Sequence, residues 1–177
     1  MKSIYIVLIA VCSLFVSCNS EPTLQKFFVE NQEKKDFIAL DISPTILNID
    51  KASLTGEQKK ALESFDKMNV IAFKANDKNK AEYEVEKAKL NTILKDEKYQ
   101  ELIKVGSGSQ GASVSFVGTE DNIEEFIFYA NKKENGFAVV RVLGDKMNPN
   151  DVMNMMSVLQ KANVDLEQLK PLQDIMK

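Results

Sequence analysis

The chain has 177 residues, of which 44% are hydrophobic and 28% charged, a balance typical of a globular protein with one sizeable core. Its formal net charge of −3 and its scattered lysines give no basic field, which makes a nucleic acid a poor partner. The chain has no histidine, which excludes Ser-His-Asp and Cys-His catalysis and any histidine-ligated zinc.

The first eighteen residues have the order of a secretory signal peptide that ends in a lipobox. Lys2 gives a short basic start, residues 4–16 form an uncharged and mostly apolar run, and the small Ser17 stands directly before Cys18. We therefore expect residues 1–17 to be removed as a lipoprotein signal peptide and the thiol of Cys18 to carry the lipid.

Two alternatives stay open for this leader. A helix needs about 20 apolar residues to cross a bilayer, and the run here is shorter, which disfavours a retained membrane span. An ordinary signal peptide cut elsewhere would leave a free soluble protein. Cys12 is a weaker lipidation candidate, because the β-branched Val11 precedes it. No cysteine follows Cys18, so the rest of the chain has no internal disulfide and depends on packing for its stability.

The chain after the cleavage site begins with a tether, residues 18–35, that contains one short amphipathic helix from Leu24 to Asn31. A strand is predicted for Phe37–Ile42, and Ser43-Pro44 breaks it. The apolar residues within 46–49 indicate a short helical turn packed under the sheet.

Two helices and a strand follow. Thr55 and Gln58 have the spacing of a capping box, which predicts a helix from there to about Lys67. Val70–Lys74 is a strand of the buried type, and the longest helix is predicted near Asn79–Leu94. The residues expected to face inward on these helices are Ala61, Leu62, Phe65, Tyr83, Leu90 and Leu94. Lys87 lies on the same line as Tyr83, and its long stem can cover apolar surface while its ammonium stays in water.

From Leu102 onward the hydrophobic pattern changes to a period of two, which predicts an antiparallel meander of four strands. The predicted strands are Leu102–Val105, Ala112–Val117, Ile123–Ala130 and Phe137–Leu143. Asn148-Pro149 starts the next helix, which turns Val152, Met155, Met156 and Leu159 inward and leaves Met153 exposed. A final short helix, interrupted by Pro171, is predicted for Val164–Met176.

These elements predict one α+β domain spanning residues 36–177. Its sheet is expected to be mainly antiparallel, to end in the four-strand meander, and to have its helices packed on one face.

Three patterns resemble functional motifs but have simpler explanations. The segment Gly106–Gly111 matches G-x-G-x-x-G, yet a strand rather than a helix follows it, which favours a flexible hairpin loop over a dinucleotide site. An acidic cluster and a calcium-loop-like group are better explained by a solvated strand face and by helix capping. The acidic cluster is Glu120, Asp121, Glu124 and Glu125, and the second group is Asp145, Asn148, Asn150 and Asp151. We therefore expect no catalytic, cofactor-binding or metal-binding residues.

Several segments resemble the domain-of-unknown-function family 4252. They are Phe37–Leu47, Glu97–Val105, the strand Phe137–Gly144 and the helix Asn150–Leu159. The similarity spans nearly the whole chain after the tether. It implies a small secreted or lipid-anchored protein of the Bacteroidetes and carries over no catalytic residues, because no activity is assigned to that family.

Together these features favour a non-catalytic lipoprotein of the cell envelope, a folded binding or scaffolding module presented on a membrane. The lipid at Cys18 would hold it, by default on the periplasmic face of the outer membrane, where an envelope protein is the expected partner and nucleic acid is not. Two alternatives stay open: an enzyme that uses paired carboxylates on cell-wall glycan, and a sensor in an envelope-stress circuit.

Overall fold

The computed structural model describes residues 21–43, 47–48, 53–161 and 163–164. The helices in this part of the chain are α2 (Leu24–Asn31), α3 (Gly56–Glu63), α4 (Lys80–Ile93) and α5 (Pro149–Lys161). The strands of the main sheet are β1 (Phe37–Ile42), β3 (Phe65–Lys74), β4 (Gln100–Ser107), β5 (Gln110–Thr119), β6 (Asn122–Lys132) and β7 (Gly136–Met147). Two short strands, β2 (Leu47–Asn48) and β8 (Asn163–Val164), pair with each other.

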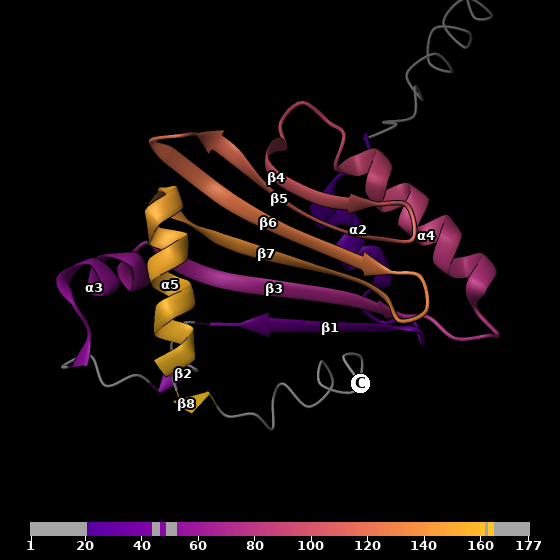
Figure 1. Ribbon diagram of the computed structural model, residues 1–177, viewed down its shortest axis with the longest axis horizontal. Coiled ribbons are helices and arrows are strands. Elements are labelled where there is room, and N and C mark those ends of the chain that lie inside the picture. The colour runs from indigo at the N-terminus through magenta and orange to yellow at the C-terminus, as the bar shows by residue number, and fades with distance from the viewer. Residues whose placement is uncertain (1–20, 44–46, 49–52, 162, 165–177) are drawn as a thin grey trace, which may run out of the picture.

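The main sheet has six strands in the order β1-β3-β7-β6-β5-β4, and every neighbouring pair is antiparallel. Strands β4 to β7 follow one another as the predicted meander, and β3 and β1 extend the sheet beyond β7 (Figure 1). The sheet therefore has β4 and β1 as its two edges. The α+β class and the C-terminal meander are confirmed.

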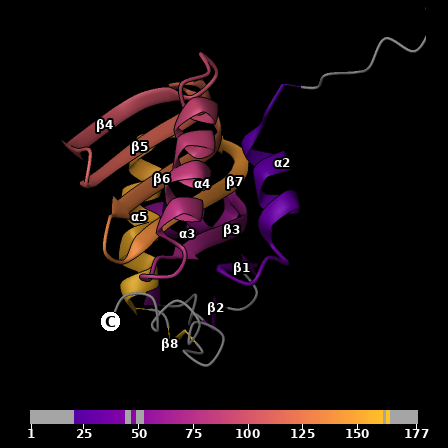
Figure 2. The same cartoon turned by 90° about the vertical axis from the view of Figure 1, so that its right-hand side faces the viewer.

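Helices cover both faces of this sheet, which corrects the prediction of a single helical face. On β6, Ile127 packs in a core with residues of α2 and α4, whereas the adjacent Phe126 packs in a second core with Met155 and Val158 of α5. Successive side chains of a strand point to opposite faces, so the two cores lie on opposite sides of the sheet. Figure 2 shows α2 and α5 on the two sides. Burial on both faces explains why β6 and β7 have apolar residues at consecutive positions.

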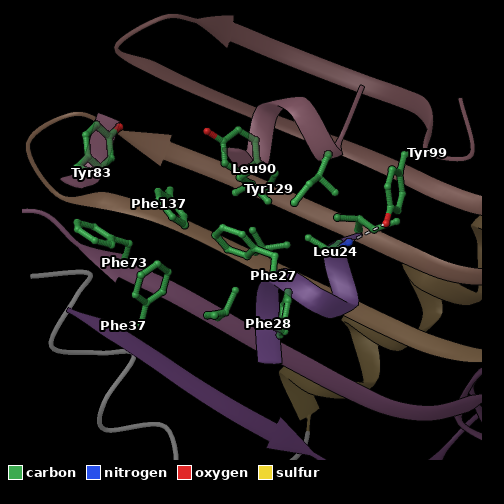
Figure 3. Packing of buried hydrophobic residues seen from close by; sticks show 14 residues of the cluster. Leu24, Phe27, Phe28, Phe37, Phe73, Tyr83, Leu90, Tyr99, Tyr129 and Phe137 are labelled. Atoms are coloured by element: carbon green, nitrogen blue, oxygen red, sulfur yellow. Dashed lines mark hydrogen bonds between the residues drawn. The ribbon is translucent and has the colours of Figure 1, made fainter. Parts of the chain in front are cut away.

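An aromatic ladder forms the centre of the core beneath α2 and α4. Phe37, Phe73 and Phe137 lie opposite one another on the neighbouring strands β1, β3 and β7. The ring centroids of Phe37 and Phe73 are 5.1 Å apart and those of Phe73 and Phe137 are 5.6 Å apart. Phe27 of α2 and Tyr83 of α4 complete the cluster (Figure 3). Aromatic pairs at these separations stabilise a core beyond the area that they bury.

Helix α2 belongs to the packed domain, although residues 18–35 were expected to form a tether outside it. Leu24, Phe27 and Phe28 are 0%, 3% and 7% exposed. The backbone N–H of Leu24 donates to Oη of Tyr99 over 3.2 Å, as Figure 3 shows. The domain therefore begins at about Leu24 rather than at residue 36.

Helix α3 begins as predicted but ends earlier. Thr55 and Gln58 form the predicted capping box, in which each side chain accepts from the backbone N–H of the other residue. The helix stops at Glu63 instead of Lys67, and Phe65, predicted to lie on the helix, begins β3. Pairing with β7 explains the difference, because Phe65 lies opposite Gly144 and is buried in the second core.

The C-terminal predictions are met in part. Helix α5 buries Met155 and Val158 and leaves Met153 71% exposed, as its spacing predicted for both methionines. The side chains of Met156 and Leu159 lie outside the described part of the chain. Residues 47 and 164 were predicted to be helical and instead lie in the short strands β2 and β8, while the rest of the predicted final helix is not among the described residues.

Candidate functional site

A groove of about 740 Å³ runs between α4 and the strands β4, β5 and β6. We call it the α4 groove. One wall is α4, which contributes Glu84, Lys87 and Asn91 to the lining, and Lys95 continues this wall just after the helix ends. The groove exists because α4 packs over β3, β6 and β7, and no helix of the described residues packs over the same face of β4 and β5.

The floor of the groove consists of small and polar side chains. Gly111, Ser113 and Ser115 of β5 lie opposite Asn131, Tyr129 and Ile127 of β6, which places these β5 residues on the α4 face. The alternate β5 residues Val114 and Phe116 point into the core on the other face. From Gly111 to Ser115 the α4 face of β5 thus has no large side chain, and open space remains beside the ring of Tyr129 on β6.

Tyr129 brings a buried hydroxyl to this floor. Its side chain is 9% exposed and lines the groove, and its Oη has no hydrogen-bond partner within the described residues. Burial, and then the nearby Tyr83, raise the pKa of the Tyr129 hydroxyl above its ordinary value. The group therefore stays protonated at neutral pH and can donate a hydrogen bond to a ligand. Figure 3 shows the rings of Tyr83 and Tyr129 on the same side of the aromatic cluster.

One end of the groove is closed by the turn between β4 and β5. Nζ of Lys87 donates to the carbonyl oxygen of Gly108 over 2.7 Å, and Nδ2 of Asn131 donates to the same oxygen over 3.3 Å. Nζ of Lys87 also lies 5.4 Å from the ring centroid of Tyr83, so this lysine joins the turn to α4. The G-x-G-x-x-G sequence joins two strands, as predicted, but only Gly108 and Ser109 form the turn, and the rest of the sequence lies in β4 and β5.

The rim of the groove has charges of both signs. Glu84 lies on α4, Lys95 lies just after its end, and Glu101 and Lys104 lie on β4. Nζ of Lys104 is 3.0 Å from Oε2 of Glu101. With Lys87 included, the groove has three lysines and two glutamates around a floor of hydroxyl and amide groups, and this near balance of charge suits a neutral or zwitterionic polar ligand better than a polyanion.

Sequence reasoning did not identify this groove. Of its lining, the sequence points to Lys87 and to the Gly106–Gly111 segment, whereas Tyr129, Ser113 and Ser115 are assigned to strands without a role. The alternation of small polar and apolar residues from Gly111 to Phe116 was the available signal, because a strand buried on both faces seldom has serine at alternate positions.

A second polar cluster joins α2 to the sheet. Nε and Nη2 of Arg141 donate to Oε1 and Oε2 of Glu125 over 2.6 Å and 3.1 Å, and Nη1 donates to Oε1 of Gln25. The guanidinium also lies 5.4 Å from the ring centroid of Phe28. Arg141 is 5% exposed. Each of the three guanidinium nitrogens already has a partner, so this cluster is a structural bridge and not a site for an anionic ligand.

The acidic cluster does not converge on one site. Glu125 is bound to Arg141, whereas Glu120, Asp121 and Glu124 are exposed. None of the four lines the α4 groove. This arrangement agrees with the interpretation of solvated charges for three of them and assigns the fourth to an ion pair.

The calcium-loop-like group caps α5, as predicted. Oδ1 of Asn148 accepts from the backbone N–H of Asn150 and of Asp151 over 2.9 Å and 3.2 Å, and Oδ2 of Asp151 accepts from the N–H of Asn148 over 2.9 Å. Asp145 is exposed. The side-chain oxygens therefore satisfy the free donors of the helix start.

A metal-binding cluster and a membrane-spanning helix are both absent from the part of the chain that the structure describes. No three His, Cys, Asp or Glu residues there lie close enough to hold a metal ion. No helix there is long and apolar enough to cross a membrane. Cys18, the predicted lipidation site, lies outside the described residues.

Comparison with known proteins agrees with the resemblance seen in the sequence. No curated protein and no solved structure matches the chain. The family of domains of unknown function DUF4252 matches residues 28–155, which include α2 from Phe28 onward, the whole main sheet and the first half of α5. The chain therefore belongs to the DUF4252 family.

Proposed function

We propose that this protein is a non-catalytic lipoprotein of the cell envelope, anchored through Cys18, and that it binds a polar ligand or an envelope protein in the α4 groove. The lipobox supports the anchor and the location. The observation that carries the binding role is the Tyr129 hydroxyl on the floor of the groove, which no described residue hydrogen-bonds.

The groove supports binding because its polar groups converge on one open space. Buried polar groups are nearly always hydrogen-bonded, and one that is not costs the folded protein free energy. A ligand that accepts a hydrogen bond from Tyr129 would remove this cost. Ser115 and Asn131 are also buried and line the same groove, so a ligand would meet three polar side chains that are held in place.

A non-catalytic role is supported by the positions of the acids. The chain has no histidine, so hydrolysis would need two carboxylates that share a cleft. In the α4 groove the acids are Glu84 on α4 and Glu101 on the β4 rim, and both are exposed to water. Two carboxylates on an open rim do not form the enclosed pair that flanks a glycosidic bond in glycan hydrolysis.

The test places a photo-crosslinking amino acid at Ser113, on the floor of the groove, in the full chain expressed in its own cell. We expect it to capture one dominant species, a protein or a glycan, that mass spectrometry identifies. The same crosslinker at Asn150, an exposed position on α5, serves as the control. Capture at Ser113 should fall strongly when Ser115 is changed to Leu, because the larger side chain would fill the floor.

The proposal fails if the two crosslinking positions give the same products, or if Ser115→Leu leaves capture at Ser113 unchanged. Thr119→Leu, which places the same leucine at an exposed position on the same strand, separates loss of the groove from a general effect on β5.

A further inference from the structure

Strand β4 is an edge strand with an apolar, exposed surface. It has eight residues and, within the described part of the chain, pairs with β5 alone, so its other side presents backbone N–H and C=O groups that no described strand pairs. Leu102, Ile103 and Val105 are 42%, 59% and 58% exposed. None of the residues of β1, the opposite edge, is a large exposed apolar side chain. Long apolar edges are templates for pairing with another strand, and proteins usually protect them.

A β-bulge decides which way the side chains of β4 point. Glu101 lies opposite Ser115, while Ile103 lies opposite Val114, so Leu102 is an extra residue in this strand. Lys104 lies opposite Ser113 and therefore shares the α4 face with Glu101. Ile103 lies on the other face of the sheet, on which Val114 packs.

We propose that β4 pairs with β4 of a second copy of this chain, antiparallel, around a twofold axis between Leu102 and Ile103. In this register Glu101 of each copy lies opposite Lys104 of the other, and Leu102 lies opposite Ile103. Oppositely charged residues that face each other across strands stabilise the pair, and like charges destabilise it. A second copy of the chain is the expected partner, because Glu101 and Lys104 of one β4 strand are complementary in charge to Lys104 and Glu101 of another.

Other pairings of two β4 strands are less favourable. A parallel pairing in register places Glu101 beside Glu101 and Lys104 beside Lys104. An antiparallel pairing shifted by one residue brings side chains of the polar face against those of the apolar face. In the proposed register the bulge does not disturb the pairing. Each strand has two residues, Leu102 and Ile103, between Glu101 and Lys104, so the two charged pairs form at both ends of this segment.

The dimer would also join the two binding grooves. The twofold axis of an antiparallel edge-to-edge pair is perpendicular to the sheet, so the α4 helices of both copies lie on the same side. Glu101 and Lys104 line the rim of the α4 groove, and the two grooves would therefore meet across the axis. The pairing itself depends on β4 alone and would stand even if the groove bound nothing.

The test exchanges the two charges between copies. Full chains with two different C-terminal tags are expressed together, and the fraction of one tag that co-purifies with the other is measured. When both tagged chains carry Glu101→Lys, or both carry Lys104→Glu, the pair has two like-charge contacts. Co-purification should then fall about tenfold from the wild-type level. When one tagged chain carries Glu101→Lys and the other carries Lys104→Glu, two attractive contacts form again. Co-purification of this mixed pair should return to near the wild-type level.

Loss in each single-variant pair together with recovery in the mixed pair is the result that this register predicts, because a parallel pair would have two like-charge contacts in the wild type and in each single variant alike. The proposal is overturned if the mixed pair co-purifies no better than the single variants, or if wild-type chains do not co-purify. Lys60→Glu and Glu63→Lys, on exposed positions of α3, are the matched control and should leave co-purification unchanged in every combination. All four residues are exposed, so these variants should fold normally, which circular dichroism verifies.

Discussion

At the scale of single residues, Tyr129 has a buried hydroxyl without a partner among the described residues, whereas Tyr99 has a buried hydroxyl that is bonded. Leaving a buried polar group unsatisfied costs about 1–3 kcal/mol. We expect Tyr129→Phe to raise the free energy of unfolding by roughly 1 kcal/mol. Chemical denaturation of the two proteins at pH 7 measures this difference.

Tyr99→Phe is the matched control, because it removes the acceptor of the Leu24 backbone N–H. It should lower the free energy of unfolding by about 1 kcal/mol. A loss of stability in both variants would mean that the Tyr129 hydroxyl has a partner in solution.

The Tyr129 hydroxyl also makes the stability of the folded protein depend on pH. Burial, and then Tyr83, raise the pKa of Tyr129 in the folded protein above its ordinary value of 10.0. The stabilisation of the neutral form is therefore complete below pH 10 and is lost as the pH rises through the folded pKa. Unfolding measured from pH 8 to pH 11 should show stability falling toward the alkaline end in the wild type and falling less in Tyr129→Phe. Parallel curves would contradict this assignment.

Gly136 is required by the backbone of the turn between β6 and β7. Its φ is +123°, and a Cβ at this position would lie 1.8 Å from the carbonyl oxygen of Phe73. We expect Gly136→Ala to cost more than about 3 kcal/mol of stability, because both the strand pairing and the backbone angle would have to change. Gly56→Ala, whose Cβ meets no atom within 4 Å, should change stability by less than about 1 kcal/mol. Thermal unfolding of the two variants distinguishes these outcomes.

At the scale of elements, α2 is the helix whose role changed most between sequence and structure. Phe27 is 3% exposed and its ring centroid lies 6.0 Å from that of Phe37. Phe27→Ala should therefore cost about 3–5 kcal/mol of stability, as expected for a core phenylalanine. Val29→Ala on the same helix, at a position 57% exposed, should cost less than about 0.5 kcal/mol. If Phe27→Ala and Val29→Ala both changed the free energy of unfolding by a small and equal amount, α2 would not be part of the packed domain.

The elements that were predicted well are those whose own hydrophobic period is strong. Helix α2 and strand β1 have the predicted bounds, and α4 and the four strands of the meander differ from prediction only at their ends. Local pattern and capping determine these elements. The end of α3 was missed because Phe65 fits a helical period, and only pairing with β7 assigns it to a strand.

The candidate site was harder to predict than the fold, for a physical reason. Glu86 is 4% exposed and is bonded to Lys34 and Lys89, yet nothing in its local sequence distinguishes it from the exposed Glu84. The α4 groove likewise depends on where α4 stops covering the sheet. A groove made by the absence of large side chains on one face is visible only after the strands are in register.

At the scale of the whole molecule, the proposed anchor sets the distance between the domain and the membrane. Helix α2 is packed in the core from Leu24 onward, so only the residues 19–23 would separate it from a lipid on Cys18. An extended chain spans at most about 3.6 Å per residue, so this tether reaches less than about 20 Å. The domain would therefore stay next to the bilayer surface, with little freedom to reach partners across the periplasm.

This arrangement requires that Cys18 be the lipidated residue. In cells given a fatty-acid analogue, Cys18→Ala should lose the label and move from the membrane fraction to the soluble fraction, because without the thioether the chain keeps no acyl group. Cys12→Ala is the matched control and should keep both the label and the membrane location, since the signal peptide that contains residue 12 is removed. Equal labelling of Cys18→Ala and the wild type would exclude the anchor. The domain would then be free of the bilayer, and β4 pairing between copies would have to occur without the high local concentration that a membrane gives to anchored proteins.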